Sequence, residues 1–380
     1  MDYEISIIGG GPAGSTAAVQ LARYGFSVGL FERKSFPREI LCGEFLSIEV
    51  AKILQKLNLF YDFLKLSPNP IKNLSFYFEE GKNINVSLNF NAYALKRSIF
   101  DKFLLNSAIN SGVNVHQPSI VRNIIRHSDH YILDVIDEKE NVNEISSKYV
   151  IAAYGKSGFL DKKLNRRFAG KQTFLNGVKF HIDNTLLNTS RSDEIKMFTS
   201  KGIYCGINTV DKFESTICFL EDRNRFRASV RDHLINLLFD KYKLSNPLKE
   251  IFQDRINSQH IYGTGNIFFG KRDIVENGIY MIGDAARVIA PLSGDGIGMA
   301  MESAMLLSKI LVNLKKSKIS KQEADKLYSN EWIKKFRSRM FLALIIQNIV
   351  MSGKINNIGY VALKNFPYLM NYLLKNTRNF

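Results

Sequence analysis

The order of apolar and polar residues predicts a strand, a helix and a second strand at the start of the chain. Tyr3–Ile8 is a short apolar run of β type, and Ser15–Tyr24 carries apolar residues at helical spacing. Gly25 ends that helix as a C-cap glycine would, and Ser27–Glu32 forms the next strand. A βαβ unit therefore occupies the first 32 residues.

Beyond this unit, two kinds of pattern alternate along the chain. Residues 174–219 alternate repeatedly between apolar and polar, which predicts a largely antiparallel sheet, and 73–90 predicts a hairpin around Gly81. Short strands are predicted at 113–115, 120–126, 131–136, 149–153 and 279–282. Helices are predicted at 47–57, 97–111, 230–252 and 296–314, and the remainder is expected to be helical.

These elements predict a mixed α/β fold in which two domains are interleaved. A Rossmann-like α/β domain, built on the βαβ unit, would comprise residues 1–70, 96–160 and 262–315. A mostly antiparallel substrate-binding sheet would comprise 71–95 and 161–261, and a basic helical C-terminal region would comprise 316–380. The longest apolar candidate for a membrane span, Met340–Val350, is too short.

Basic residues are concentrated at the C-terminal end of the chain. The net charge is +16, and residues 309–380 contribute +11 of it, with 14 basic and three acidic residues. Contact with a membrane surface or an acidic carrier is one interpretation, a solvated helical surface is favoured, and no nucleic-acid partner is expected. The cysteines Cys42, Cys205 and Cys218 are widely spaced, which argues against a metal site or a disulfide framework and fits the cytoplasm, with peripheral membrane contact as an alternative.

The glycines after the first strand follow the dinucleotide-binding spacing G-x-G-x-x-G. Gly9 permits the tight turn, Gly11 lets the backbone approach a pyrophosphate, and Gly14 allows helix and strand to pack closely. Pro12 and Ala13 begin the helix, whose free N–H groups would face the phosphates.

The second strand ends in an acid. Glu32 stands 23 residues after Gly9, where a carboxylate can bond adenosine ribose hydroxyls, and Arg33 is expected to adjoin the nucleotide. An acid at this point would repel a 2′-phosphate, which argues against NADP in this pocket.

The glycine motif alone does not separate NAD from FAD, but a later segment, 278–304, does. Its Ile282-Gly283-Asp284-Ala285 and Pro291-Leu292-Ser293-Gly294-Asp295-Gly296-Ile297-Gly298 resemble the G-D motif of FAD-dependent aromatic hydroxylases and geranylgeranyl-reductase-like dehydrogenases. The resemblance implies FAD as cofactor, with Gly283 and Asp284 at its ribityl chain. It also implies that Gly294, Gly296, Ile297 and Gly298 lie against the isoalloxazine, where a helix N-terminus would stabilise reduced flavin.

Two further segments share the resemblance. Arg97-x-x-Phe100-Asp101 resembles the helix whose arginine lies near FAD, and Cys42-Gly43-Glu44 resembles a loop near the flavin in the reductase-like branch. Cys42 is interpreted either as a substrate-side residue or as a buried small apolar residue.

The chain also departs from these families. Ala153-Tyr154-Gly155 replaces the A-D-G motif of hydroxylases, and the single tryptophan, Trp332, leaves no paired-tryptophan motif of halogenases. Tyr204-Cys205-Gly206-Ile207-Asn208 replaces the Y-x-W-x-F-P stretch of prenyl reductases.

No catalytic constellation independent of the flavin is visible, so the substrate-side candidates are Cys42, Glu44, Tyr204, Pro291 and Leu292. His181 is interpreted as structural. The leading hypothesis is a monooxygenase that hydroxylates a hydrophobic aromatic or polyketide-like molecule, with NAD(P)H as transient electron donor. The alternatives are a reductase or dehydrogenase of carbon–carbon double bonds in an isoprenoid or lipid, and a non-catalytic flavin-binding scaffold.

Overall fold

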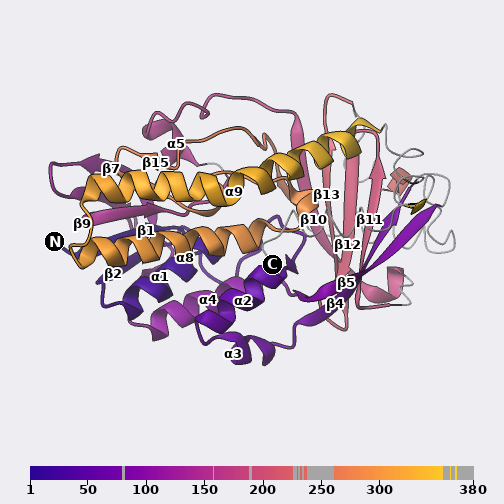
Figure 1. Ribbon diagram of the computed structural model, residues 1–380, viewed down its shortest axis with the longest axis horizontal. Helices are drawn as coiled ribbons and strands as arrows, with labels where there is room; N and C mark the ends of the chain where they lie inside the picture. Colours follow the sequence, from indigo (N-terminus) through magenta and orange to yellow (C-terminus); the bar gives the residue numbers. More distant parts are fainter. Residues whose placement is uncertain are drawn as a thin grey trace.

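Two eight-stranded sheets stand end to end, and two long helices run along them (Figure 1). The structure, a computed structural model, describes residues 1–78, 82–156, 158–187, 191–225, 229, 232, 235–237, 261–353, 360 and 364–365. The helix predicted at 230–252 and the tip of the predicted hairpin therefore fall largely outside the described residues.

The first sheet, sheet A, has the strand order β15-β16-β9-β1-β2-β6, with β7 and β8 attached to β9. Its parallel core places β1 between β2 and β9, and the antiparallel β7 and β8 extend β9 to one side. The strands are β1 (Tyr3–Ile8), β2 (Val28–Phe31), β6 (Asn114–His116), β7 (Ile120–Arg126), β8 (Tyr131–Ile136), β9 (Val142–Ala152), β15 (Val275–Glu276) and β16 (Ile279–Met281).

Helices pack beside this parallel core. α1 is buried along most of its length, which fits its run of small and apolar residues, and it contacts both α4 and α8. The helices are α1 (Pro12–Arg23), α2 (Ile48–Lys56), α3 (Phe60–Leu64), α4 (Arg97–Asn110), α5 (Phe159–Lys163) and α8 (Gly296–Lys315). The mixed α/β fold class is thus confirmed.

The second sheet, sheet B, has the order β14-β10-β13-β12-β11-β4-β5-β3, antiparallel except between β4 and β11. Side chains alternate between its faces, so Phe180 and Phe198 pack in one cluster while Met197 and Tyr204 belong to another. The strands are β3 (Phe45–Leu46), β4 (Asn69–Tyr77), β5 (Asn83–Ala94), β10 (Leu175–Asp183), β11 (Glu194–Ser200), β12 (Ile203–Thr209), β13 (Glu214–Asp222) and β14 (Tyr262–Thr264).

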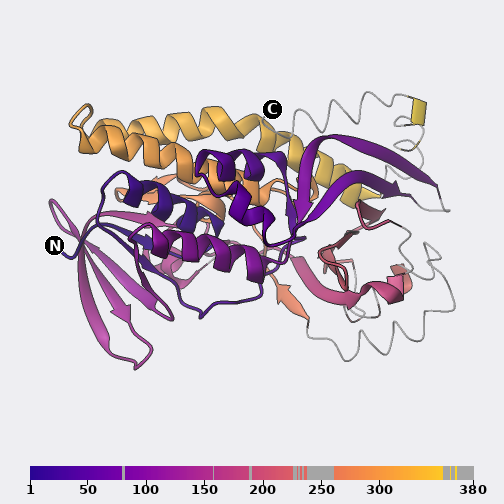
Figure 2. The same ribbon diagram turned by 90° about the horizontal axis from the view of Figure 1, so that it is seen from below.

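The C-terminal helix α9 (Lys321–Ser352) joins the two halves, since it lies beside α8 and continues to β11 and β12 (Figure 2). Ser320 and Glu323 form a capping box at its start, and Gly353, with a φ of 72°, ends it.

Two details differ from the predictions. β3 and β14 lie in sheet B, although both ranges were assigned to the Rossmann-like domain, because short edge strands carry little pattern of their own. In the described part of the chain α8, rather than Met340–Val350, is long and apolar enough to cross a membrane, but 61% of its apolar window is buried and it contacts α1, α2 and α9.

Candidate active site

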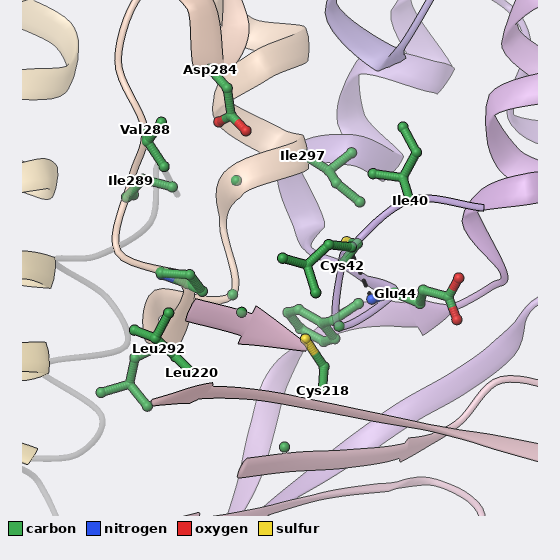
Figure 3. A pocket seen from close by; sticks show the side chains of 18 of the residues that line it. Ile40, Cys42, Glu44, Cys218, Leu220, Asp284, Val288, Ile289, Leu292 and Ile297 are labelled. Atoms are coloured by element: carbon green, nitrogen blue, oxygen red, sulfur yellow. Dashed lines mark hydrogen bonds between the residues drawn. The ribbon is translucent and has the colours of Figure 1, made fainter. Parts of the chain in front are cut away.

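A cavity of about 1140 Å³ lies where the carboxyl ends of the β1 and β9 strands meet one face of sheet B (Figure 3). It is lined by most of the residues predicted for the cofactor and the substrate: Gly9, Gly11, Pro12, Ala13, Glu32, Arg33, Cys42, Glu44, Arg97, Tyr204, Gly283, Asp284, Pro291, Leu292, Gly294, Gly296 and Ile297. Gly14 and Gly298 do not line it.

The first glycine turn opens toward this cavity. Gly9 has a φ of +109°, and a Cβ at Gly14 would lie 1.9 Å from the Gly9 carbonyl oxygen, so no larger residue fits between α1 and the turn. At Gly11, by contrast, a Cβ would meet only the Arg38 Nη2 atom, at 3.8 Å. The N-terminus of α1 therefore offers an open backbone cradle of the kind that binds a pyrophosphate.

Glu32 is fixed beside this cradle. Its Oε2 accepts a hydrogen bond from the Gly10 N–H at 2.8 Å, and its Oε1 accepts one from the Lys34 N–H at 3.0 Å. A third contact comes from Arg38, 3.3 Å away. A carboxylate accepts about four hydrogen bonds, so Glu32 retains capacity for a ribose hydroxyl.

Arg38 is a cofactor-side residue that the sequence analysis missed. Its guanidinium lies between the carboxylates of Glu32 and Asp101, and its Nε is buried without a hydrogen-bond partner among the described residues. Unpartnered N–H groups beside a phosphate cradle suit an anionic ligand. The Phe36-Pro37-Arg38 segment follows the second strand of the βαβ unit, but nothing in its spacing indicates that this arginine turns back toward the glycines.

The second flavin-type segment reaches the cavity from the opposite side. A Cβ at Gly283, whose φ is +60°, would lie 3.0 Å from the Ala13 Cβ, so the turn after β16 packs directly on the start of α1. Asp284 points into the cavity near Ile297 (Figure 3).

The Pro291–Ser293 3₁₀ turn and Gly294, at φ +64°, carry the chain to the start of α8. A Cβ at Gly296 would meet only Ile289, at 3.6 Å, which leaves open space above the helix N-terminus. Gly298 differs from its prediction, since its Cβ would fall 2.7 Å from Asp295 Oδ1 and 2.9 Å from Ser47 Oγ. It allows α8 to pack against its neighbours rather than to face a ligand.

These features together fit FAD. The Gly11 cradle would hold the pyrophosphate, Glu32 the adenosine ribose, Asp284 the ribityl chain, and the Gly294–Ile297 backbone the flavin ring. When bound, FAD would supply the redox chemistry, and the protein supplies orientation and the surrounding electrostatics.

The Cys42–Glu44 loop lies between the cofactor residues and sheet B. Arg97, which lines the cavity, pairs through two nitrogens with Asp101 at 2.7 and 2.8 Å, and its backbone N–H donates to Glu44 Oε1 at 2.8 Å. Cys42 and, from β13, Cys218 both line the cavity (Figure 3). Burial raises the pKa of Cys218 to about 12, so this group is a neutral thiol at neutral pH.

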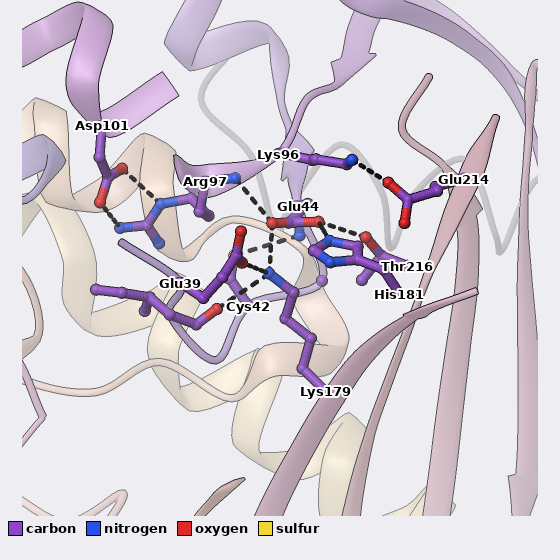
Figure 4. Close-up of polar contacts among 12 residues, drawn as sticks. Glu39, Cys42, Glu44, Lys96, Arg97, Asp101, Lys179, His181, Glu214 and Thr216 are labelled. Atoms are coloured by element: carbon purple, nitrogen blue, oxygen red, sulfur yellow. Dashed lines mark hydrogen bonds and ion pairs between the residues drawn. The ribbon is translucent and has the colours of Figure 1, made fainter. Parts of the chain in front are cut away.

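Glu44 is the centre of a buried polar cluster (Figure 4). Fully buried and at a φ of 57°, it accepts hydrogen bonds from Lys179 Nζ at 2.5 Å and from Thr216 Oγ1, and its Oε2 lies 2.7 Å from His181 Nε2. Burial alone would raise the pKa of Glu44, but the hydrogen bond with His181 and the charge of Lys179 outweigh it and lower the pKa to about 2. Glu44, predicted as a substrate-side residue, is therefore ionised, and its contacts fix the Cys42–Glu44 loop to sheet B.

The spacing of two residues on β10 could have predicted this cluster. Lys179 and His181 stand two residues apart on β10 and so share the face of the sheet toward Glu44. Glu39, Glu44 and His181 also form a group with metal-ligand spacing, but the Lys179 ammonium lies 2.6 Å from Glu39 and 2.5 Å from Glu44. That ammonium pairs with both carboxylates and balances one of their two charges, so the group is an ion-pair cluster.

The sheet B wall of the cavity is mainly apolar. Leu74, Met197, Leu220 and Val350 surround Tyr204, whose side chain is buried and whose hydroxyl has no hydrogen-bond partner among the described residues. Burial raises the pKa of Tyr204 well above its ordinary value, so the hydroxyl stays protonated. Tyr204 is nevertheless one of the residues that line the cavity.

Arg339 connects α9 to the start of α8. Its guanidinium contacts the carboxylates of Asp295, Glu302 and Glu49, with the Glu302 pair at 2.6 Å. These buried side chains lie on α2 and on α8 with its N-cap, so α9 is held firmly against the Gly294–Ile297 turn.

Known proteins share this fold and these motifs. The FAD binding domain family matches residues 2–331. A digeranylgeranylglycerophospholipid reductase from Thermoplasma volcanium is 24% identical over 322 residues, which cover 81% of this chain and 77% of the reductase.

Two solved structures are similar in fold. A flavin-dependent brominase has a TM-score of 0.78 at 18% identity, over 99% of this chain and 93% of that chain. The p-nitrophenol 4-monooxygenase from Pseudomonas putida DLL-E4 also has a TM-score of 0.78 at 18% identity, over 98% of this chain and 96% of that one.

The family match covers both glycine motifs and the cavity residues up to Ala300, and it confirms the resemblance stated from sequence. The chain therefore belongs to the FAD binding domain family and is a member of the FAD-dependent oxidoreductase superfamily.

Proposed function

We propose that the protein is an FAD-dependent reductase of carbon–carbon double bonds in a long apolar molecule, such as an isoprenoid lipid. The observation that carries this proposal is the wall opposite the flavin segments. It is apolar, with aliphatic residues such as Leu74 and Leu220 and aromatic ones such as Phe76 and Phe219. The thiols of Cys42 and Cys218 and the hydroxyl of Tyr204 are among its proton-bearing groups.

Reduction of a double bond adds a hydride to one carbon and a proton to the other. FAD supplies the hydride when reduced, so the protein has to supply a weak acid and a dry surface. Cys42, on the loop between the cofactor residues and sheet B, is the proposed proton donor. Glu39 and Glu44 also line the cavity, but both are paired with Lys179.

The lipid reductase from Thermoplasma volcanium and the replacement of the hydroxylase A-D-G motif by Ala153-Tyr154-Gly155 support the same proposal. NAD(P)H remains the proposed transient electron donor.

A monooxygenase acting on an aromatic or polyketide-like molecule is the second candidate. It is favoured by the glycine turn Gly294–Ile297, which lines the cavity where the hydroxylase resemblance puts the flavin ring. Tyr204 would then anchor a polar group of the aromatic substrate.

Product mass separates the two candidates. The FAD-loaded protein would be incubated under air with NAD(P)H and either a prenyl lipid or a set of substituted phenols, and the products analysed by mass spectrometry. The gain of two hydrogens by the lipid supports the reductase. The gain of one oxygen atom by a phenol, with the lipid unchanged, would replace the reductase by the monooxygenase.

A further inference from the structure

The outer face of α9 carries an apolar surface on three successive turns. Phe341 is 66% exposed, Ile345 38% and Ile349 40%. The three residues are four apart, so they lie in one row along the helix, and the exposed Arg337 begins the same row one turn earlier. We call Arg337, Phe341, Ile345 and Ile349 the outer row.

The outer row continues into the active-site cavity. Ile345 and Ile349 also line the cavity, together with Leu342 and Ile346 on the adjoining side of the helix, whereas Phe341 does not. An apolar path therefore runs from solvent at Phe341, over Ile345 and Ile349, to the wall that contains Tyr204.

The row is held in place rather than loosely attached. Arg339 and the buried Phe336 and Met340 fix the opposite side of the same turns to the body of the protein. The apolar residues of the outer row thus remain exposed although the helix that carries them is well packed.

The basic residues near the outer row indicate which kind of surface the row would bind. Arg337 and Lys334 are exposed at its N-terminal end, and residues 309–380 carry a net charge of +11. Exposed apolar side chains next to basic ones are typical of helices that lie on anionic bilayers, with the apolar groups inserted below the headgroups.

We propose that the outer row of α9 docks on an anionic lipid bilayer, so that an apolar substrate passes from the bilayer into the cavity over Ile345 and Ile349. The docking is a property of the surface and does not depend on which reaction the flavin performs.

Vesicle flotation of the FAD-loaded protein, without substrate, tests the proposal. The protein is expected to float with vesicles of phosphatidylcholine mixed with phosphatidylglycerol, and much less with phosphatidylcholine alone. Phe341→Ser is expected to lower the partition coefficient by about tenfold, because a large apolar side chain no longer enters the bilayer. Arg337→Gln is expected to lower it by about fivefold on the anionic vesicles alone.

Phe213→Ser is the matched control, since Phe213 is 65% exposed on a turn of sheet B, away from α9. Unchanged FAD content in all variants shows that they are folded.

The proposal is overturned if the wild-type protein does not bind anionic vesicles, or if Phe341→Ser and Phe213→Ser bind equally well. It is also overturned if Phe341→Ser instead abolishes a dimer seen by sedimentation, because the row would then bind a second copy of the chain. None of these outcomes bears on product mass, so failure here is distinct from failure of the proposed reductase activity.

Discussion

On the nucleotide side of the cavity the ligand-facing surface is backbone, at Gly9, Gly11 and Gly296, whereas on the sheet B side it consists of side chains such as Met197 and Leu220. The backbone surface tolerates no larger residue at Gly14, because an added Cβ there would collide with the Gly9 carbonyl group. Aliphatic side chains can exchange with others of similar volume at modest cost. The cofactor site is therefore restricted in sequence, while the substrate wall is free to diverge and to change specificity.

The largest expected effect on ligand binding comes from breaking the backbone surface. Gly14→Ala should weaken FAD binding by about 100-fold, since the added methyl group forces α1 away from the turn. Fluorescence titration of the apoprotein with FAD measures this. Gly170→Ala is the control, because a Cβ there would meet nothing within 4 Å. Normal FAD affinity in Gly14→Ala would show that the turn is not the cofactor cradle.

The next effect concerns the buried polar cluster around Glu44, which joins the cofactor side of the cavity to sheet B. Glu44→Gln should lower the free energy of unfolding at neutral pH by about 3–5 kcal/mol, because Lys179 loses a buried partner. Denaturant unfolding measures the change. Glu4→Gln, which removes a partly exposed pair with Lys315, should cost less than about 1 kcal/mol.

The same variant has a pH signature. The pKa of Glu44 is lowered from 4.5 to about 2, so its stabilisation is fully present above pH 4.5 and is lost as the pH falls toward 2. Wild-type stability should decline more steeply through this range than that of Glu44→Gln. Parallel curves would contradict the ionised state assigned to Glu44.

The smallest effect separates substrate binding from cofactor binding. Tyr204→Phe should raise the KM for the apolar substrate by about tenfold, and it should leave FAD affinity unchanged, because Tyr204 belongs to the substrate wall and not to the cofactor side of the cavity. The free protein should be slightly more stable, since a buried hydroxyl without a partner among the described residues is removed.

Tyr131→Phe offers the opposite control. Its hydroxyl donates to the Asn277 carbonyl oxygen at 3.1 Å, away from the cavity, so stability should fall and KM stay constant. Equal changes in FAD and substrate affinity for Tyr204→Phe would show that the two walls are not independent.

The same contrast explains what the sequence could predict. Glycine spacing and a terminal acid have few structural alternatives, so they predicted Gly9 and Glu32 as cofactor residues, and the family resemblance added Asp284; all three line the cavity. Contacts that depend on how separate segments meet were not foreseen: Arg38 turning back to Glu32, Lys179 reaching Glu44, and Arg339 reaching Asp295. The edge strands β3 and β14 were missed for the same reason, since their partners lie far away in sequence.

The most direct test of the proposed function is an anaerobic one. The FAD-loaded protein would be reduced chemically, mixed with a prenyl lipid in the absence of oxygen, and followed by flavin absorbance. The account predicts that the lipid alone restores the oxidised flavin spectrum and gains two hydrogens per flavin. A flavin that stays reduced until oxygen is admitted would contradict the reductase proposal.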